Sequence, residues 1–206
     1  MLWLNKAIIY LVPAVLAVTV HEVAHGWTAS QLGDPTAARM GRLSLNPLRH
    51  IDPIGTLLVP ALVFWASGFY FGWAKPVPVN WGNLRHFRRD VALVAAAGPL
   101  ANLLMLLGWW LVLLMISPAA PVLWRMGWTG IGFNATIMLL NLLPVPPLDG
   151  SRIVTAALPP RLAAGYNRIE PFGLVILAGL LATGVIGTIL DPCLSWILNL
   201  VESLLR

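Results

Sequence analysis

The chain has 206 residues, of which 58% are hydrophobic and only 10% are charged. Soluble domains carry about 25% charged residues, so this composition excludes an ordinary soluble domain, and it excludes a disordered chain as well. The net charge of +5 suits basic loops on one side of a membrane, and no basic helix with interleaved aromatic residues indicates a nucleic-acid partner. The single cysteine excludes an intrachain disulfide. We therefore expect residues 1–206 to form a single membrane domain.

The first half of the chain begins with a long apolar run from Ala7 to Leu32, which is long enough to span a bilayer. A polar, basic stretch follows, and its brief alternation over Arg42–Leu45 weakly predicts a strand. Residues 54–71 are apolar but interrupted by Gly and Pro, so their length is borderline for a span. Prolines within Trp73–Trp81 predict extended chain there.

The second half contains a clear spanning helix, Val91–Ile116, and a further apolar crossing, Gly127–Leu143. Another span is predicted over Phe172–Leu190, stopped by Asp191-Pro192. The tail Cys193–Arg206 is short for a span and is expected at the interface or against the bundle. The predicted fold is an all-α polytopic membrane protein with about five to six transmembrane helices and a re-entrant or short β segment after the first helix.

The first apolar run contains the pentapeptide His21-Glu22-Val23-Ala24-His25, an HExxH pattern. On a helix, residues four apart share a face, so both imidazoles can reach one metal ion. Neutral imidazole suits zinc, which lowers the pKa of a bound water to about 7, and Glu22 lies where it can take that proton. The alternatives are a polar packing cluster or histidines near the membrane surface.

A catalytic zinc site needs a third protein ligand, and Asp149 is the strongest candidate. It follows an apolar run, and the prolines before it together with Gly150 after it are expected to break the helix and aim the carboxylate inward. A loop aspartate that caps the next helix is the alternative.

Topology favours one arrangement of these groups. If His25 and Asp149 both lie at the C-terminal ends of their helices, the chain between them crosses the membrane an even number of times. Val91–Ile116 and Gly127–Leu143 supply two crossings, so residues 54–71 should dip into the bilayer and return. That arrangement also gathers most Lys and Arg residues on the side of the motif, which indicates the cytoplasmic side.

These motifs resemble those of the site-2 protease family of intramembrane zinc metalloproteases over roughly Val12 to Arg152. The matching stretches are His21–Gly26, Phe71–Asn80, Gly98–Asn102 and Asn141–Gly150. The resemblance implies one zinc per chain held by His21, His25 and Asp149, with Glu22 as the general base. It also places Asn102 and Asn141 near the metal, as groups that bind the substrate backbone or the developing oxyanion. Hydrogen bonding between helices is the alternative for both asparagines.

The same resemblance implies regulated intramembrane proteolysis, in which a peptide bond within or near a transmembrane segment of a protein substrate is cut close to the cytoplasmic face. We expect a multi-pass protein of a prokaryotic cell membrane, a minimal form without a PDZ or CBS domain. Its expected partners are the substrate and the lipid bilayer, and a homo-oligomer is left open. Two other functions remain as alternatives: a membrane carrier of metal ions, and a non-catalytic membrane scaffold.

Overall fold

The computed structural model describes residues 2–59, 61–62, 65 and 74–205. Within these residues the chain is helical and contains no strand, which confirms the predicted helical class. The strand predicted over Arg42–Leu45 is wrong, because no segment among the described residues pairs with this stretch. The Arg42 guanidinium instead turns toward the carbonyl groups of Lys75 and Pro76.

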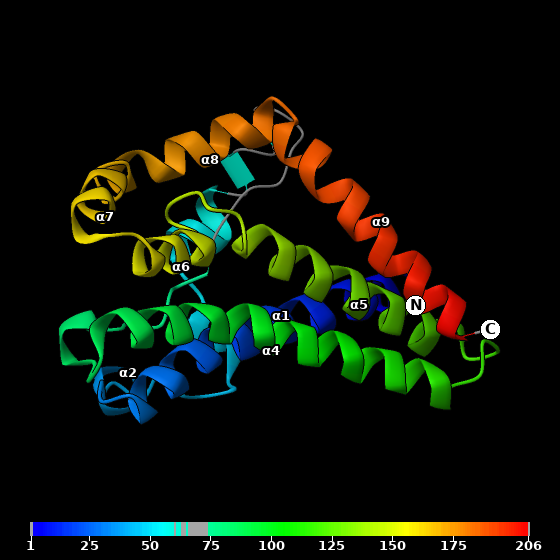
Figure 1. The fold of residues 1–206 in the computed structure, drawn as a ribbon. Helices are drawn as coiled ribbons and strands as arrows, with labels where there is room; N and C mark the ends of the chain where they lie inside the picture. The colour runs from blue at the N-terminus through cyan, green and yellow to red at the C-terminus, as the bar shows by residue number, and fades with distance from the viewer. Residues whose placement is uncertain (1, 60, 63–64, 66–73, 206) are drawn as a thin grey trace.

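Three helices form the centre of the molecule: α1 (Leu2–Gln31), α4 (Phe87–Met115) and α5 (Pro121–Asn141), each packed against the other two (Figure 1). Glycines let α5 approach α4 closely, since a Cβ on Gly130 would lie 2.5 Å from the Trp109 ring. Small residues at such contacts are typical of helices that pack within a membrane, where close backbone approach replaces the hydrophobic driving force.

The last helix, α9 (Val185–Leu205), packs against α5 and closes one end of the bundle. A buried apolar cluster joins it to α4 and α5, and consists of Leu106, Leu113, Ile131, Ala135 and Val201. The two chain ends lie toward this same end of the bundle (Figure 1).

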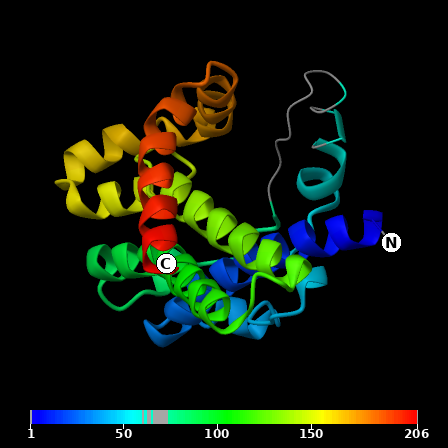
Figure 2. The ribbon, with the colours of Figure 1, turned by 90° about the vertical axis from the view of Figure 1, so that its right-hand side faces the viewer.

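Among the described helices, α1, α4 and α9 are long and apolar enough to cross a membrane. This is fewer than the five to six transmembrane helices predicted. The crossing expected at Gly127–Leu143 is part of α5, which begins earlier, at Pro121, and ends at Asn141. Half of the segment expected to dip into the bilayer, residues 54–71, lies outside the described residues. Its described part includes the π-helix η2 (Pro53–Leu58), which projects away from the bundle (Figure 2).

The span predicted over Phe172–Leu190 is wrong. The chain forms a short helix, α8 (Gly173–Ala182), turns at Gly184, and continues as α9. Gly184 has a φ of 75°, a left-handed conformation that ends a helix and that glycine adopts without strain. Pro192, expected to stop a helix, lies inside α9, so the segment expected at the interface is the continuation of that helix.

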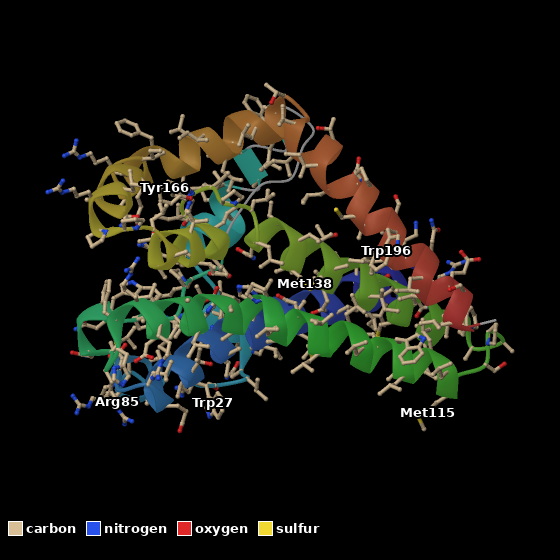
Figure 3. All side chains as sticks on the ribbon, in the orientation of Figure 1. Trp27, Arg85, Met115, Met138, Tyr166 and Trp196 are labelled. Atoms are coloured by element: carbon tan, nitrogen blue, oxygen red, sulfur yellow. The ribbon has the colours of Figure 1, made fainter. Side chains whose placement is uncertain are left out.

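Short elements connect these helices on the side of the bundle opposite the chain ends. They are α2 (Thr36–Arg39), η1 (Pro47–His50), η3 (Trp81–Asn83), α6 (Asp149–Ala157), α7 (Pro160–Asn167) and η4 (Glu170–Phe172). Arg85, just before α4, and Tyr166, on α7, lie toward this end, whereas Met115 at the end of α4 lies at the other (Figure 3). α6 packs on α4, and Arg88 donates hydrogen bonds to the carbonyl groups of Ala156 and Leu158 at the end of α6.

Candidate metal centre

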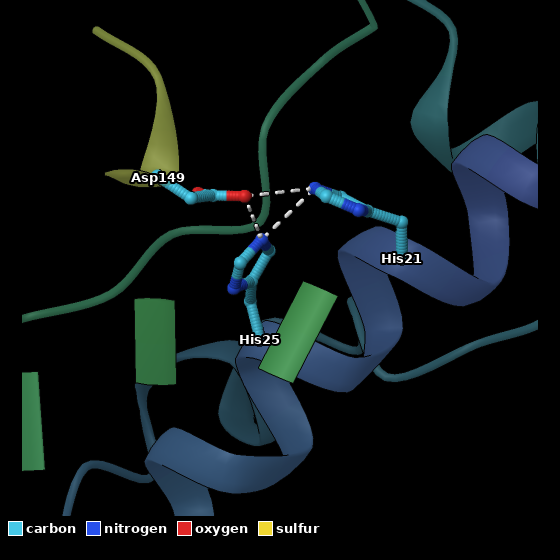
Figure 4. Close-up of side chains that lie close together, drawn as sticks. All are labelled: His21, His25 and Asp149. Atoms are coloured by element: carbon cyan, nitrogen blue, oxygen red, sulfur yellow. Dashed lines mark hydrogen bonds and ion pairs between the residues drawn. The ribbon is translucent and has the colours of Figure 1, made fainter. Parts of the chain in front are cut away.

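Three side chains from two distant helices converge at one point (Figure 4). His21 and His25 lie one turn apart on α1, and their Nε2 atoms are 3.0 Å apart. Asp149 Oδ2 lies 3.2 Å from His21 Nε2 and 3.3 Å from His25 Nε2. The structure therefore brings together the two helical histidines and the aspartate that the sequence analysis singled out.

Asp149 reaches this point from a different position than expected. It is the first residue of α6, not the last of a helix, because α5 ends at Asn141 and the prolines lie in the connecting loop. Gly150 does not break the helix but lies within it. A Cβ at Gly150 would lie 2.5 Å from the carbonyl oxygen of Leu143, so glycine lets the start of α6 lie directly on the end of α5.

Hydrogen bonds at the far side of each imidazole decide which ring nitrogen carries the proton. His21 Nδ1 lies 2.6 Å from Asn102 Oδ1, and His25 Nδ1 lies 2.7 Å from the carbonyl oxygen of Val94. Both partners are oxygens that can only accept, so each Nδ1 donates. In neutral imidazoles, the Nε2 lone pairs then point toward each other and toward Asp149.

These contacts fit a cation. Among the described residues, the buried Asp149 Oδ2 has no hydrogen-bond partner, although a buried carboxylate oxygen without one is costly. With both imidazoles neutral, three electron-pair donors at 3.0, 3.2 and 3.3 Å repel one another, and a cation between them removes that repulsion. Bonds of about 2.0–2.1 Å at tetrahedral angles separate ligand atoms by about 3.3 Å, so the three atoms fit three corners of a zinc site.

Glu22 lies beside this group but does not belong to it. Its side chain is half-buried, and Oε2 accepts a hydrogen bond of 2.7 Å from the backbone N–H of Val77. Glu22, the three candidate ligands and Asn141 line one cavity of about 720 Å³. The rest of its wall is mainly apolar and comes from the segment after residue 73, the α5–α6 connection and α8. An acid that binds no metal in such a cavity is free to exchange protons with what enters it.

The two asparagines predicted near the metal have different surroundings. Asn102 is fully buried, and its amide group donates to the Ala17 carbonyl at 3.2 Å and to Asn134 Oδ1 at 2.9 Å. Since its oxygen accepts from His21, Asn102 is placed to orient that ring. Asn141 lines the cavity and donates to the Ile137 carbonyl in its own helix, so its role toward a substrate stays a prediction.

Other groups at the site were not found from the sequence. Gly98 on α4 leaves the space in which both imidazoles lie, since a Cβ there would be 2.5 Å from His21 Cε1. The Val94 carbonyl and the Val77 N–H are backbone groups, so their residue types gave no signal. Gly98 lies within the stretch that supported the family resemblance, which was the only available indication.

Outside the apolar helices, Asp34 joins the end of α1 to the chain that precedes α4. It is fully buried and accepts hydrogen bonds from Asn80 N at 2.7 Å and Asn83 Nδ2 at 2.9 Å, and from the backbone N–H of Thr36 at 3.2 Å. Burial by itself raises the pKa of this carboxyl, but the hydrogen bonds from Thr36, Asn83 and Asn80 outweigh burial and hold the pKa below its ordinary value.

Comparison with known proteins gives relatives along most of the chain. It is 36% identical over 194 residues to "Putative zinc metalloprotease YwhC" of Bacillus subtilis, covering 90% of this chain and 85% of the relative. It is 33% identical over 174 residues to "Putative zinc metalloprotease Rip2" of Mycolicibacterium smegmatis, covering 82% of this chain and 64% of the relative. It is also 33% identical over 168 residues to "Putative zinc metalloprotease Rip2" of Mycobacterium tuberculosis, covering 79% of this chain and 62% of the relative. No family model matches the chain, and no solved structure matches it significantly.

Proposed function

The chain belongs to the family of YwhC and Rip2, each named "Putative zinc metalloprotease", and from this premise we propose that it is an intramembrane zinc endopeptidase of the site-2 protease type. Its substrate is a membrane protein, cut within or near a transmembrane segment. The observation that carries the proposal is the convergence of His21, His25 and Asp149 beside an acid, Glu22, that takes no part in the ligand group.

His21 Nε2, His25 Nε2 and Asp149 Oδ2 would hold one zinc ion per chain. When bound there, zinc supplies Lewis acidity, which polarises a peptide carbonyl and makes water acidic enough to lose a proton near neutral pH. Asn102 and the Val94 carbonyl keep both imidazoles in the tautomer that presents Nε2.

Glu22 is the proton-transfer group. It takes a proton from the attacking water and later delivers it to the nitrogen of the leaving amine, which is the ordinary work of a general base that becomes a general acid. Asn141 lies on the cavity wall, which supports a role for its amide group as a donor to the substrate carbonyl. The mainly apolar wall favours an apolar segment, whose helix must unwind locally because helical hydrogen bonds shield its carbonyl groups.

The helices around the site support its place within the membrane. α1, which carries both histidines, and α4, which orients them, are long and apolar enough to cross a bilayer. The basic residues around Arg85 lie at the end of the bundle where α6 and α7 lie, so this end faces the cytoplasm under the positive-inside rule. The named relatives are bacterial proteins, which supports a multi-pass protein of a prokaryotic cell membrane.

The test compares wild type with Glu22→Gln in detergent, on a pool of single-span proteins in which an apolar helix broken by Gly, Asn or Pro joins two soluble tags. We expect cleavage by wild type only, with equal zinc content in both. Equal cleavage by both proteins would refute the proposed mechanism. Asp149→Ala should lose zinc, and zinc binding that survives this change would refute the three-ligand site.

Glu22 also distinguishes the proposed protease from a membrane carrier of metal ions. A carrier has little need of an acid that is not a ligand, so Glu22→Gln should leave zinc flux into liposomes unchanged if the protein transports zinc. Flux that depends on His21 and Asp149 but not on Glu22, without any cleavage, would favour the carrier.

A further inference from the structure

An extended segment, residues 74–80, crosses α1 beside the candidate metal centre without forming part of a sheet. Its sequence contains Pro76-Val77-Pro78. Proline carries no backbone N–H, so Val77 supplies the only donor in this tripeptide. The following proline also restricts Val77 to extended conformations, which fixes the direction of that donor. The donor points at Glu22, with a distance of 2.7 Å from Val77 N to Glu22 Oε2.

Contacts on both sides of Val77 hold the segment in place. On one side, the buried Arg42 donates through Nη2 to the carbonyl groups of Lys75 at 2.9 Å and Pro76 at 3.3 Å. On the other side, the N–H of Asn80 donates to the buried Asp34 at 2.7 Å. The backbone donor is therefore fixed from two directions by charged side chains that lie outside the metal centre.

The Val77 side chain is seated on α1 one turn beyond Glu22. A Cβ on Gly26 would lie 2.6 Å from Val77 Cγ1, so the glycine provides the notch that the valine occupies. Gly26 and Glu22 are four residues apart and share a helix face. The same residue of the segment thus packs on α1 with its side chain and binds the neighbouring acid with its backbone.

We propose that the Val77 N–H is a positioning group for Glu22, and that Arg42 and Asp34 position it in turn by holding segment 74–80. This inference rests on the proposed function, in which Glu22 transfers protons. A glutamate side chain has several rotamers, and only some place its carboxylate beside the ligand group. The hydrogen bond to Oε2 selects one of them and leaves Oε1 for the attacking water.

The sharpest test deletes the donor and keeps the chain extended. Val77→Pro removes the N–H, whereas Val77→Ala keeps it and shortens the side chain. We expect Val77→Pro to lower kcat by about ten- to a hundredfold, the effect of losing one hydrogen bond to a charged group. KM and zinc content should stay within twofold of wild type, and Val77→Ala, which keeps the N–H but loses the packing against Gly26, should lower kcat less than Val77→Pro does. A raised KM with unchanged kcat would overturn the proposal, because the segment would then act on substrate binding alone.

The role of Arg42 in holding segment 74–80 is tested by changing its side chain. Arg42→Gln should lower kcat in the same way, and Arg42→Lys should restore much of it, because an ammonium group can still donate to carbonyl oxygens. The control is Arg39→Gln, which removes the same charge from an exposed residue at the end of α2. Equal kcat in Arg42→Gln and Arg39→Gln would overturn the role of Arg42.

Amide hydrogen exchange tests the contact without any substrate. Because the prolines on both sides carry no amide hydrogen, exchange within residues 76–78 reports Val77 alone. Glu22→Ala should speed this exchange, and an unchanged rate would overturn the hydrogen bond even if the protease activity is real. If Glu22→Gln cleaves like wild type, the proposed function fails instead, and a faster exchange in Glu22→Ala would still support the contact.

Discussion

Replacing Gly98 with alanine tests whether the ligand atoms occupy the positions described here. Gly98 lies on α4 directly against both imidazoles. An added Cβ would lie 2.5 Å from His21 Cε1 and 2.7 Å from His21 Nε2, and closer still to His25 Nε2. We expect Gly98→Ala to fold and to lose most of its zinc affinity.

The expected loss of zinc affinity can be judged from these distances. Ordinary van der Waals contact begins at 3.4 Å, so the His21 ring must move by about 0.9 Å (3.4 minus 2.5). Zinc ligands fit only within about 0.2 Å of their proper bond lengths, and a misplacement of about 1 Å in a site costs on the order of a hundredfold. We therefore expect zinc affinity to fall by about a hundredfold, with cleavage falling at least as much.

The measurement is zinc binding in detergent by competition with a chelator of known affinity. Gly108→Ala is the matched control, because this glycine lies on the same helix and a Cβ there meets nothing within 4 Å. That variant should bind zinc like wild type and should be slightly more stable, since alanine favours helix. Wild-type zinc affinity in Gly98→Ala would refute the placement of the imidazoles against α4.

Three further substitutions separate the roles of polar residues around the site. Asn102→Leu should lower zinc affinity by about 10- to 100-fold in the same competition assay, because His21 Nδ1 loses the partner that orients the ring; an unchanged affinity would contradict that role. Asn141→Leu should leave zinc affinity unchanged and lower kcat by about a hundredfold if its amide group binds the oxyanion, and an unchanged kcat would exclude this. Asp34→Asn should destabilise the protein by about 2 kcal/mol at pH 7, since the amide cannot accept all the bonds that the carboxylate accepts. Because the pKa of Asp34 is lowered in the folded state, the stability it supplies is complete above a pH of about 4 and is lost as the pH falls through the folded-state pKa. The difference in Tm between wild type and Asp34→Asn should therefore shrink in thermal unfolding below that pH, and a difference that stays constant would contradict the carboxylate's role.

The candidate ligands could be found from the sequence because their residue types carry the chemistry. His21 and His25 stand at helical spacing in an apolar run, where ionisable groups are costly without a function. Asp149 could be recognised as an acidic residue that directly follows an apolar stretch. Its position at the start of α6 could not be predicted, because it depends on where α5 ends and on the contact between Gly150 and the end of α5.

Errors in the predicted helices have a physical cause in local context. Hydropathy is averaged over a window of residues, and residues 172–190 are mainly apolar. The hydropathy pattern therefore gave no sign that the chain turns at Gly184. Pro192 was expected to stop a helix, but it lies inside α9, a helix that packs against α5.

The groups that position the site are those that sequence patterns describe least. The Val94 carbonyl and the Val77 N–H orient His25 and Glu22, yet every residue carries a carbonyl group and all but proline carry an N–H. Gly98 contributes because it has no Cβ, which leaves room for both imidazoles. A sequence therefore indicates which side chains can bind zinc and move protons, whereas their working geometry comes from backbone groups and empty space that only the folded chain defines. For this reason, substitutions at Val77 and Gly98 test the site more sharply than removal of the ligands, which nearly any metal-site model predicts to be damaging.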